Sequence, residues 1–222
     1  MRRILIFLMA LCLCILPARG EQLPKYVALT FDDGPSGQYT QRLLEGLADR
    51  GVHATFFLCG YRLETYPELA QAIRRSGHEI GLHGYSHKDL SRMNVQAVSS
   101  ELRRTQALLP EGTLVNLMRS PGGNLSKAVY QAAKEMGLAV IQWSVDPEDW
   151  ATRDSALIHS RVVSHTKNAD VILLHDMTDS SVEAALEIVD TLKAQGYQFL
   201  TVSQLAMLNL THLSSGRKYN SF

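Results

Sequence analysis

The chain has 222 residues, and its 22 basic side chains balance its 22 acidic ones, so the formal net charge is zero. No run or stripe of Lys and Arg stands out, which argues against a nucleic-acid-binding protein. A chain of this length can bury one hydrophobic core and form a single domain. Cys59 is the one cysteine beyond residue 20, so we expect no internal disulfide, and the core alone must stabilise the fold.

The N-terminus has the pattern of a secretory signal peptide. Two arginines precede a 13-residue apolar stretch at 4–16, which is shorter than the roughly 20 residues of a membrane span. Small residues stand three and one positions before Glu21, as at a cleavage site. We therefore expect a signal peptide at 1–20, a single folded domain at 21–222, and export as a secreted protein or into the periplasmic or cell-wall space. An uncleaved anchor is the alternative, because Arg19 is unusual beside a cleavage site.

Hydrophobic periodicity in the rest of the chain alternates between strand and helix patterns. Short apolar runs predict strands over residues 26–29, 54–58, 78–81, 114–118, 138–143, 171–174 and 199–201. Helical spacing predicts helices over 39–50, 67–77, 95–109, 126–136, 155–166 and 182–194, with a short one after residue 201. Asn94, Ser126 and Ser155 stand where N-caps are expected. The polar tail from Asn209 has no such pattern and is expected to be loose.

Strands and helices in alternation indicate an α/β fold with parallel strands in a single domain. We expect a closed or nearly closed (β/α) barrel of about seven strands, with an open doubly wound sheet as the alternative. In either fold, the side chains that carry function lie at the C-terminal ends of the strands.

Ionisable side chains follow five of these strands. They are Asp32 and Asp33 after the first strand, His83 and His87 after the third, Arg119 after the fourth, Asp146 and Asp149 after the fifth, and His175 and Asp176 after the sixth. Because one rim of the sheet collects them all, we expect a functional site there rather than a simple acidic turn at Asp32-Asp33. Neighbouring strand residues point to opposite sides, so the two aspartates can have different roles.

His83 and His87 are four residues apart with Gly84 between them, and two imidazoles at this spacing can bind one metal from a tight loop. A histidine pair alone is more often a chance surface feature. Together with Asp33, the pair forms a His-His-carboxylate set that leaves coordination positions open, as in catalytic zinc sites. Ligands of this kind without thiolate also suit Fe²⁺, Co²⁺, Ni²⁺ or Mn²⁺.

The other residues at this rim also have ordinary structural interpretations. Arg119 is either a surface arginine before a turn or a cation that binds a carboxylate through two hydrogen bonds. Asp149 and Trp150 are either a turn over a packed ring or part of the site. His175 is either a satisfied core histidine or, facing a metal site, a general acid. Gly122 leaves a backbone N–H unobstructed, which suits an oxyanion.

Taken together and in this order, five segments resemble the polysaccharide deacetylase family, which is carbohydrate esterase family four, also known as the NodB homology domain. They are Thr-Phe-Asp-Asp-Gly-Pro at 30–35, His-x-x-x-His at 83–87, Arg-x-Pro-x-Gly at 119–123, Asp-Trp at 149–150 and Leu-x-His at 173–175. Residues 51–57 and 77–81 resemble strands that lie between the family's motifs. Each segment alone is weak evidence, but the ordered set is specific.

The resemblance implies a distorted (β/α) barrel that hydrolyses N-acetyl groups of an aminosugar polymer, with zinc as the expected metal. Peptidoglycan N-acetylglucosamine or chitin-like oligosaccharides are the expected substrates. The resemblance implies that Asp32 is the general base, that His175 is the general acid, and that Asp33, His83 and His87 bind the metal. It also implies that Arg119 tunes Asp32 and that Asp149 tunes His175. Gly122 would contact the oxyanion, and Trp150 and Leu173 would contact the acetyl methyl group. An O-acetyl esterase or small-amide hydrolase of the same fold is one alternative. A non-catalytic carbohydrate-binding protein is another, and it would lack at least one of these residues.

The chain departs from the family pattern at three positions. Gly84 replaces a usual Ser or Thr whose hydroxyl braces the metal-binding loop, and Leu82 replaces a common Asn. Gly122 replaces a common Tyr, which removes one wall of the substrate groove. The first two departures put metal affinity in question, and the third puts the substrate range in question.

Overall fold

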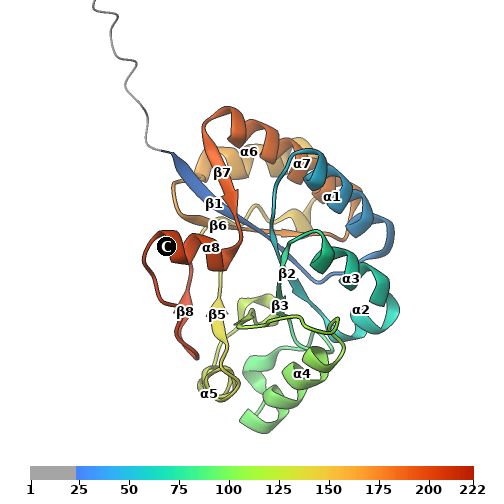
Figure 1. Ribbon diagram of the computed structural model, residues 1–222, viewed down its shortest axis with the longest axis vertical. Helices are drawn as coiled ribbons and strands as arrows, with labels where there is room; N and C mark the ends of the chain where they lie inside the picture. Colours follow the sequence, from blue (N-terminus) through green and yellow to red (C-terminus); the bar gives the residue numbers. More distant parts are fainter. Residues whose placement is uncertain (1–23) are drawn as a thin grey trace, which may run out of the picture.

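The strands form a single sheet that curls into a distorted barrel. The computed structural model describes residues 24–222, so the predicted signal peptide and its cleavage site lie outside the described residues. The strand order is β6-β1-β2-β3-β4-β5-β8, with β7 paired to β1, and every pair of named strands is parallel (Figure 1). A parallel bridge between Val145 and Ile172 joins the segment after β5 back to β6, so the two edges of the sheet meet. The predicted barrel is confirmed, and the open sheet is wrong.

Most predicted elements are confirmed, with shifts at their ends. The strands in the described part of the chain are β1 (Lys25–Asp32), β2 (Thr55–Leu58), β3 (Glu79–Leu82), β4 (Leu117–Met118), β5 (Ala139–Ile141), β6 (Asp170–His175), β7 (Tyr197–Leu200) and β8 (Lys218–Tyr219). The α-helices are α1 (Gly37–Asp49), α2 (Gly60–Thr65), α3 (Pro67–Arg75), α4 (Val95–Ala107), α5 (Lys127–Glu135), α6 (Ser155–His165), α7 (Asp179–Ala194) and α8 (Val202–Leu208). Short 3₁₀ helices are η1 (Leu90–Arg92), η2 (Pro121–Gly123) and η3 (Asp149–Ala151). Among the helices described, none has the length and apolarity needed to span a membrane.

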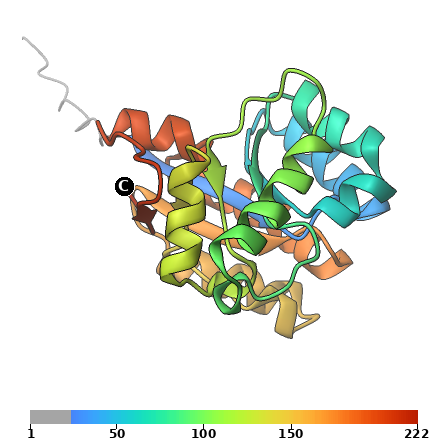
Figure 2. The same ribbon diagram turned by 90° about the horizontal axis from the view of Figure 1, so that it is seen from below.

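Side-chain alternation along β1 separates two hydrophobic cores. Val27, Leu29 and Phe31 belong to a cluster that includes buried residues of α1, α3 and α7. Ala28 belongs to a separate cluster with Phe57. Successive strand residues point to opposite faces, so the first set packs under the helices and the second lies inside the curled sheet. Figure 2 shows the helices arranged around the outside of the strands.

Local sequence explains where the helices begin. Asn94 and Ser126 are N-caps as predicted, because their side chains accept hydrogen bonds from backbone N–H groups in the first turn. The predicted cap at Ser155 is wrong by one residue. Asp154 is the N-cap and accepts from the N–H of Leu157. Aspartate caps a helix as well as serine does, so the sequence alone allowed either position.

The C-terminal tail is ordered, which corrects the prediction of a loose tail. Lys218–Tyr219 form β8 and pair with β5. Tyr219 is only 9% exposed, its hydroxyl donates to the backbone oxygen of His212, and its ring stacks on Phe222 with 5.8 Å between centroids. Two aromatic rings at the end of a polar segment were the signal that the segment packs onto the barrel.

Two further differences concern the middle of the chain. The strand predicted over 114–118 shortens to β4, because Leu114 is 93% exposed and cannot lie in the sheet. Helix α2 was not predicted, since its six residues are too few to show a helical period. Helix α7 begins at Asp179, three residues earlier than predicted, with Thr178 as its N-cap.

Candidate active site

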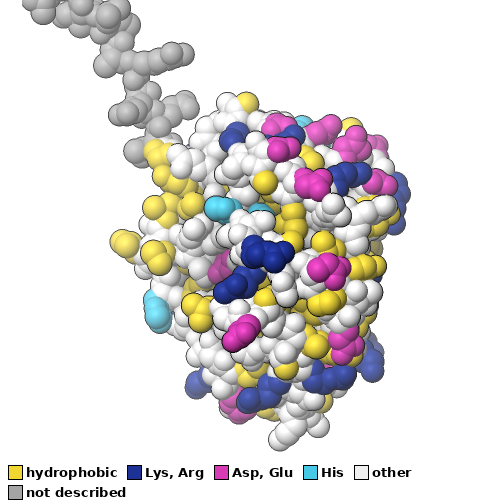
Figure 3. Space-filling model, turned by 45° about the vertical axis from the view of Figure 1, so that its right-hand side comes forward, with side chains coloured by type: hydrophobic (Ala, Val, Ile, Leu, Met, Phe, Trp, Pro, Cys, Tyr) yellow, Lys and Arg dark blue, Asp and Glu magenta, His cyan; other side chains and the backbone are white. Residues whose placement is uncertain are grey.

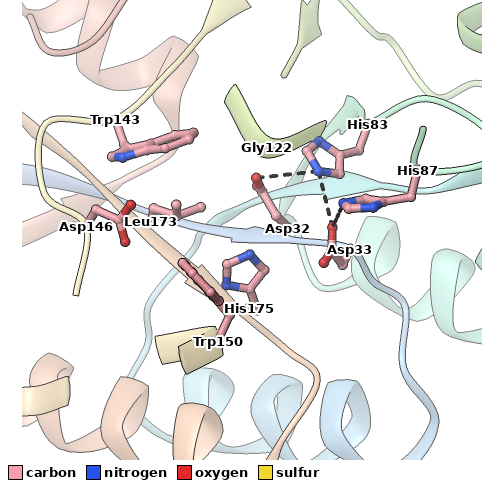
Figure 4. Close-up of a pocket in the computed structure, with 10 residues that line it drawn as sticks. All are labelled: Asp32, Asp33, His83, His87, Gly122, Trp143, Asp146, Trp150, Leu173 and His175. Carbon is pink, nitrogen blue, oxygen red and sulfur yellow. Dashed lines mark ion pairs between the residues drawn. The ribbon is translucent and has the colours of Figure 1, made fainter. Parts of the chain in front are cut away.

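A pocket of about 350 Å³ opens at the C-terminal ends of the strands (Figure 4). It is lined by Asp32, Asp33, His83, His87, Gly122, Trp143, Asp146, Trp150, Leu173 and His175. Eight of the ten predicted site residues are therefore brought together. The other two, Arg119 and Asp149, are completely buried and lie behind the pocket wall.

Strand register explains why Asp32, Leu173 and His175 face the same space. In the parallel pair β1–β6, Asp32 is directly opposite His175, and Thr30 is opposite Leu173. Partner residues in a parallel pair point to the same face, and the face alternates with every residue. Phe31 and Leu174 at the intervening level belong instead to the outer core. A shift of one residue in either strand would turn these side chains away from the pocket.

The two neighbouring aspartates point to different partners. Asp32 is the last residue of β1, and Asp33 follows it with a φ of 73°, in the left-handed region that few residues other than glycine adopt. Oδ1 of Asp33 lies 3.2 Å from Nε2 of His83 and 2.9 Å from Nε2 of His87. Oδ2 of Asp32 lies 3.7 Å from the same His83 nitrogen. Backbone conformation thus separates two carboxylates that are adjacent in sequence.

Asp33, His83 and His87 form a set that fits a divalent cation. Their ligand atoms all lie within 4.8 Å of one another. Oδ1 of Asp33 is buried and makes no hydrogen bond of acceptable geometry, although both imidazole nitrogens are close to it. An anionic oxygen and two nitrogens that converge without hydrogen-bond alignment match the donor set of a metal site.

The orientation of His83 is fixed from behind the site. Its Nδ1 lies 2.9 Å from the backbone oxygen of Arg119. A carbonyl oxygen can only accept, so Nδ1 carries a proton and donates it, and Nε2 is the ring nitrogen directed to Asp33. Such a contact to a backbone carbonyl is typical of histidines that bind metals.

Arg119 lies inside the barrel and joins three strands. Its Nη1 donates to Oδ1 of Asp32 at 2.7 Å and to Oγ1 of Thr30 at 2.8 Å. Nε and Nη2 donate to the backbone oxygens of Ile141 and Gln142 at 3.1 Å and 2.9 Å. The surface-arginine interpretation is therefore wrong. The guanidinium is fully buried, fixes one oxygen of Asp32 and leaves the other directed to His83.

His175 is held by Asp149 in a charged pair. Nδ1 of His175 lies 2.7 Å from Oδ1 of Asp149, and the backbone N–H of His175 donates to Oδ2 of the same carboxylate at 2.9 Å. Burial alone would lower the pKa of His175, but the hydrogen bond and negative charge of Asp149 raise it to about 9. The imidazolium is therefore the stable form at neutral pH.

Aromatic and apolar side chains form the remaining wall. Leu173 is 3% exposed, as expected at the floor of a pocket, and Trp150 is 62% exposed, as expected at its rim. Trp143 was not predicted as a site residue, although its position at the C-terminal end of a predicted strand was the available signal. A Cβ on Gly123 would lie 2.6 Å from the Trp143 ring, so glycine permits the ring to pack against this turn. Figure 4 shows Trp143 and Asp146 at the opposite end of the pocket from His83 and His87.

Asp176, which the sequence places at the same rim, does not line the pocket. Its side chain is fully buried and accepts a hydrogen bond from the hydroxyl of Thr40. Burial raises the pKa of Asp176 to about 6. A Cβ on Gly34 would meet its Oδ1 at 2.6 Å, so the carboxyl packs beneath the turn that follows Asp33.

Charged side chains of both signs are interspersed on the surface shown in Figure 3. Lys and Arg side chains lie near Asp and Glu side chains on this face, in keeping with the balanced composition.

Comparison with known proteins identifies relatives for this arrangement. Residues 19–141 match the family model for polysaccharide deacetylases. The peptidoglycan-N-acetylmuramic acid deacetylase PdaC of Bacillus subtilis is 38% identical over 183 residues, which cover 82% of this chain and 38% of PdaC. The chain therefore spans well under half the length of that relative. A peptidoglycan-N-acetylglucosamine deacetylase of Bacillus cereus is 36% identical over 187 residues, with 82% of this chain and 88% of that protein covered.

The fold is also present in a solved metal complex. The structure of a family 4 acetyl xylan esterase from Clostridium thermocellum with a cobalt ion superposes with a TM-score of 0.83 at 30% identity. The match covers 89% of this chain and 98% of the esterase. A protein of the same architecture thus binds a cobalt ion.

Proposed function

Because this chain belongs to the polysaccharide deacetylase family, we propose that it removes N-acetyl groups from an aminosugar polysaccharide by metal-dependent hydrolysis. One observation carries the proposal. The Asp33, His83 and His87 set, the Asp32 carboxylate and the His175 imidazolium face one pocket, so a metal site, a base and an acid surround the same space. The reaction produces acetate and a free amine on the sugar.

Asp33, His83 and His87 hold the metal in this proposal. Zinc is the expected ion, and cobalt, nickel, iron or manganese fit the same nitrogen and carboxylate ligands. When bound, such an ion lowers the pKa of a water ligand and polarises a carbonyl oxygen. The tautomer of His83 supports this assignment, because it leaves Nε2 free as a ligand atom.

Asp32 is the general base. Its Oδ1 is occupied by Arg119, so Oδ2 is the oxygen that accepts a proton from the attacking water. The buried guanidinium stabilises the charged carboxylate and fixes its rotation. Asp32 and His175 are register partners in adjacent strands and face the same pocket, which supports their action on one bound acetyl group.

His175 is the general acid, and Asp149 keeps it charged. Because Nδ1 is directed to Asp149, Nε2 is the atom that gives its proton to the leaving amine. Trp150 and Leu173 provide an apolar surface for the acetyl methyl group. The backbone N–H of Gly122 is proposed to donate to the oxyanion, and a metal held by Asp33, His83 and His87 would share that charge.

The favoured substrate is the N-acetylglucosamine of peptidoglycan, with chitin-like oligosaccharides next. The names of the two bacterial relatives support an N-acetylated cell-wall sugar as the substrate class. An O-acetyl esterase is the second candidate, because the acetyl xylan esterase shares this fold. Both reactions use the same base and oxyanion contacts, but only the amine leaving group needs a strong proton donor such as His175.

The site of action is proposed to be outside the cytoplasm, in the periplasmic or cell-wall space. The apolar stretch near the N-terminus and the cell-wall substrates of the relatives support this location. N-terminal sequencing of exported protein is expected to begin at Glu21. A sequence that begins at Met1 would instead identify an uncleaved anchor.

The deciding experiment is acetate release from a panel of acetylated glycans, followed by mass spectrometry of the products. The purified protein should deacetylate peptidoglycan fragments or chitin oligosaccharides, lose this activity on chelation, and regain it with Zn²⁺ or Co²⁺. Activity on acetylxylan alone would establish the esterase. Full activity in metal-free protein, or none on any aminosugar with metal restored, would reject the proposal.

A further inference from the structure

We propose that Glu101 is a positioning residue that holds the loop between the two metal-binding histidines, an inference that rests on the proposed metal site. Glu101 lies on α4, outside the pocket. Its Oε2 accepts three hydrogen bonds from the loop, from the backbone N–H of Tyr85 at 2.9 Å, the backbone N–H of Ser86 at 2.8 Å and the hydroxyl of Ser86 at 2.9 Å. Bonds from backbone N–H to a carboxylate are stronger than neutral ones.

The other side of the loop is held by α2. The backbone N–H groups of Gly60 and Tyr61 donate to the carbonyl oxygens of Gly84 and Tyr85, each at 3.0 Å. The loop thus has its carbonyls bound by one helix and its N–H groups bound by another. Glu101 provides the side-chain part of this arrangement, and no backbone group of α4 is involved in the bonds to Tyr85 and Ser86.

The conformation that Glu101 stabilises is one that the loop does not adopt easily. Gly84 has a φ of 76°, and His87 has a φ of 56°, which is unfavourable for a residue with a side chain. His87 is also half-exposed, with 41% of its side chain accessible, so packing alone does not fix it. Three hydrogen bonds one and two residues before His87 offset the backbone strain and hold its Nε2 at 2.9 Å from Asp33.

The same contacts explain the missing hydroxyl at Gly84. A residue with a Cβ would be strained at this φ whatever space it had, and the position of that Cβ would be 3.7 Å from Oε2 of Glu101. A serine or threonine brace is therefore replaced by a carboxylate from a neighbouring helix. Glu101 supplies the brace that is missing at Gly84, through its hydrogen bonds with Tyr85 and Ser86.

The test is a titration of the metal-free protein with Zn²⁺ alone, competed against a chromophoric chelator. Glu101→Gln retains size but replaces the charged acceptor, and its affinity for Zn²⁺ should fall about 10- to 100-fold, as for other residues that orient metal ligands. Ser86→Ala removes only one of the three donors, so its affinity should fall about two- to tenfold. Restoring Zn²⁺ to saturation should recover most of kcat in both variants, with KM unchanged.

The matched control is Glu64→Gln. Glu64 accepts a hydrogen bond from the hydroxyl of the same Tyr85 at 2.7 Å, but it does not contact the loop backbone. Zn²⁺ affinity should be unchanged in this variant, and so should the thermal midpoint of the metal-free protein. If Glu101→Gln lowers the thermal midpoint of the metal-free protein, its loss of Zn²⁺ affinity could reflect lower stability. The Zn²⁺ affinity of Ser86→Ala then tests the proposal, since the serine hydroxyl is not part of the core.

Three results would overturn the proposal. They are wild-type Zn²⁺ affinity in folded Glu101→Gln, wild-type affinity in Ser86→Ala when Glu101→Gln does not fold, and an equal loss of affinity in Glu64→Gln. The titration contains no polysaccharide. An inactive protein that still binds Zn²⁺ in a Glu101-dependent way would therefore reject the proposed function and leave the role of Glu101 standing.

Discussion

Replacing Asp149 by Asn should lower the pKa of His175 strongly. Asp149 uses both oxygens, one for the backbone N–H of His175 and the other for its Nδ1. An asparagine has only one acceptor oxygen, which the backbone N–H requires, so the amide NH₂ would face Nδ1. A donor opposite Nδ1 disfavours a proton there, and the buried imidazole becomes neutral.

The expected fall in the pKa of His175 follows from the environment of its ring with and without Asp149. The pKa of His175 is about 9 with Asp149 present, against an ordinary value of 6.5. At about 1.4 kcal/mol per pKa unit, this difference favours the imidazolium by about 3 kcal/mol. At pH 8 about 90% of the wild-type imidazole is protonated, whereas about 3% is protonated at a pKa of 6.5. Without Asp149, burial is the largest effect and lowers the pKa of His175, and the smaller effects of the Asp32 and Asp33 charges oppose it.

The assay is an NMR titration of the His175 ring in metal-free protein, followed by the pH dependence of kcat/KM in the metal-restored enzyme. The wild-type ring should titrate near pH 9, and the variant at or below 6.5. The alkaline loss of activity should move to lower pH by about the same amount, so the rate at pH 8 falls about 30-fold. A bound cation would lower the pKa of His175 in the wild type and in the variant alike, so the difference between the two pKa values would remain. An unchanged His175 titration in folded Asp149→Asn would refute the reasoning.

The same pair should affect stability. The raised pKa of His175 adds stability to the metal-free protein that is complete below pH 6.5 and is lost as the pH rises through about 9, and Asp149→Asn should abolish this dependence in chemical denaturation. Asp33→Asn should lose bound metal, whereas Asp32→Asn should keep it and lose about 10²- to 10⁴-fold in rate. Metal analysis of both variants checks this, and the opposite result would reverse the two roles. Arg119→Met leaves Asp32 buried without its partner and should lower the free energy of unfolding by about 3–5 kcal/mol; an unchanged denaturation midpoint would contradict this.

The sequence by itself determined which segments form most of the strands and which residues follow them. Periodicity is a local property, so the apolar runs before Asp32, His83 and His175 could be recognised without knowing their partners. The spacing of the two histidines and the two aspartates also lies within a few residues. These groups were therefore placed on one rim before any tertiary contact was known.

Only the tertiary structure decided how these groups are held. Arg119 contacts Asp32 across 87 positions of sequence, and Glu101 contacts the loop between His83 and His87 from helix α4. The tail forms β8 because β5 offers it a free edge, not because its own residues show a strand period. Contacts of this kind depend on how separate elements pack, and packing leaves no periodic trace in a single sequence. The chemistry of the site was therefore readable from local patterns, while its orientation, tautomers and bracing required the fold.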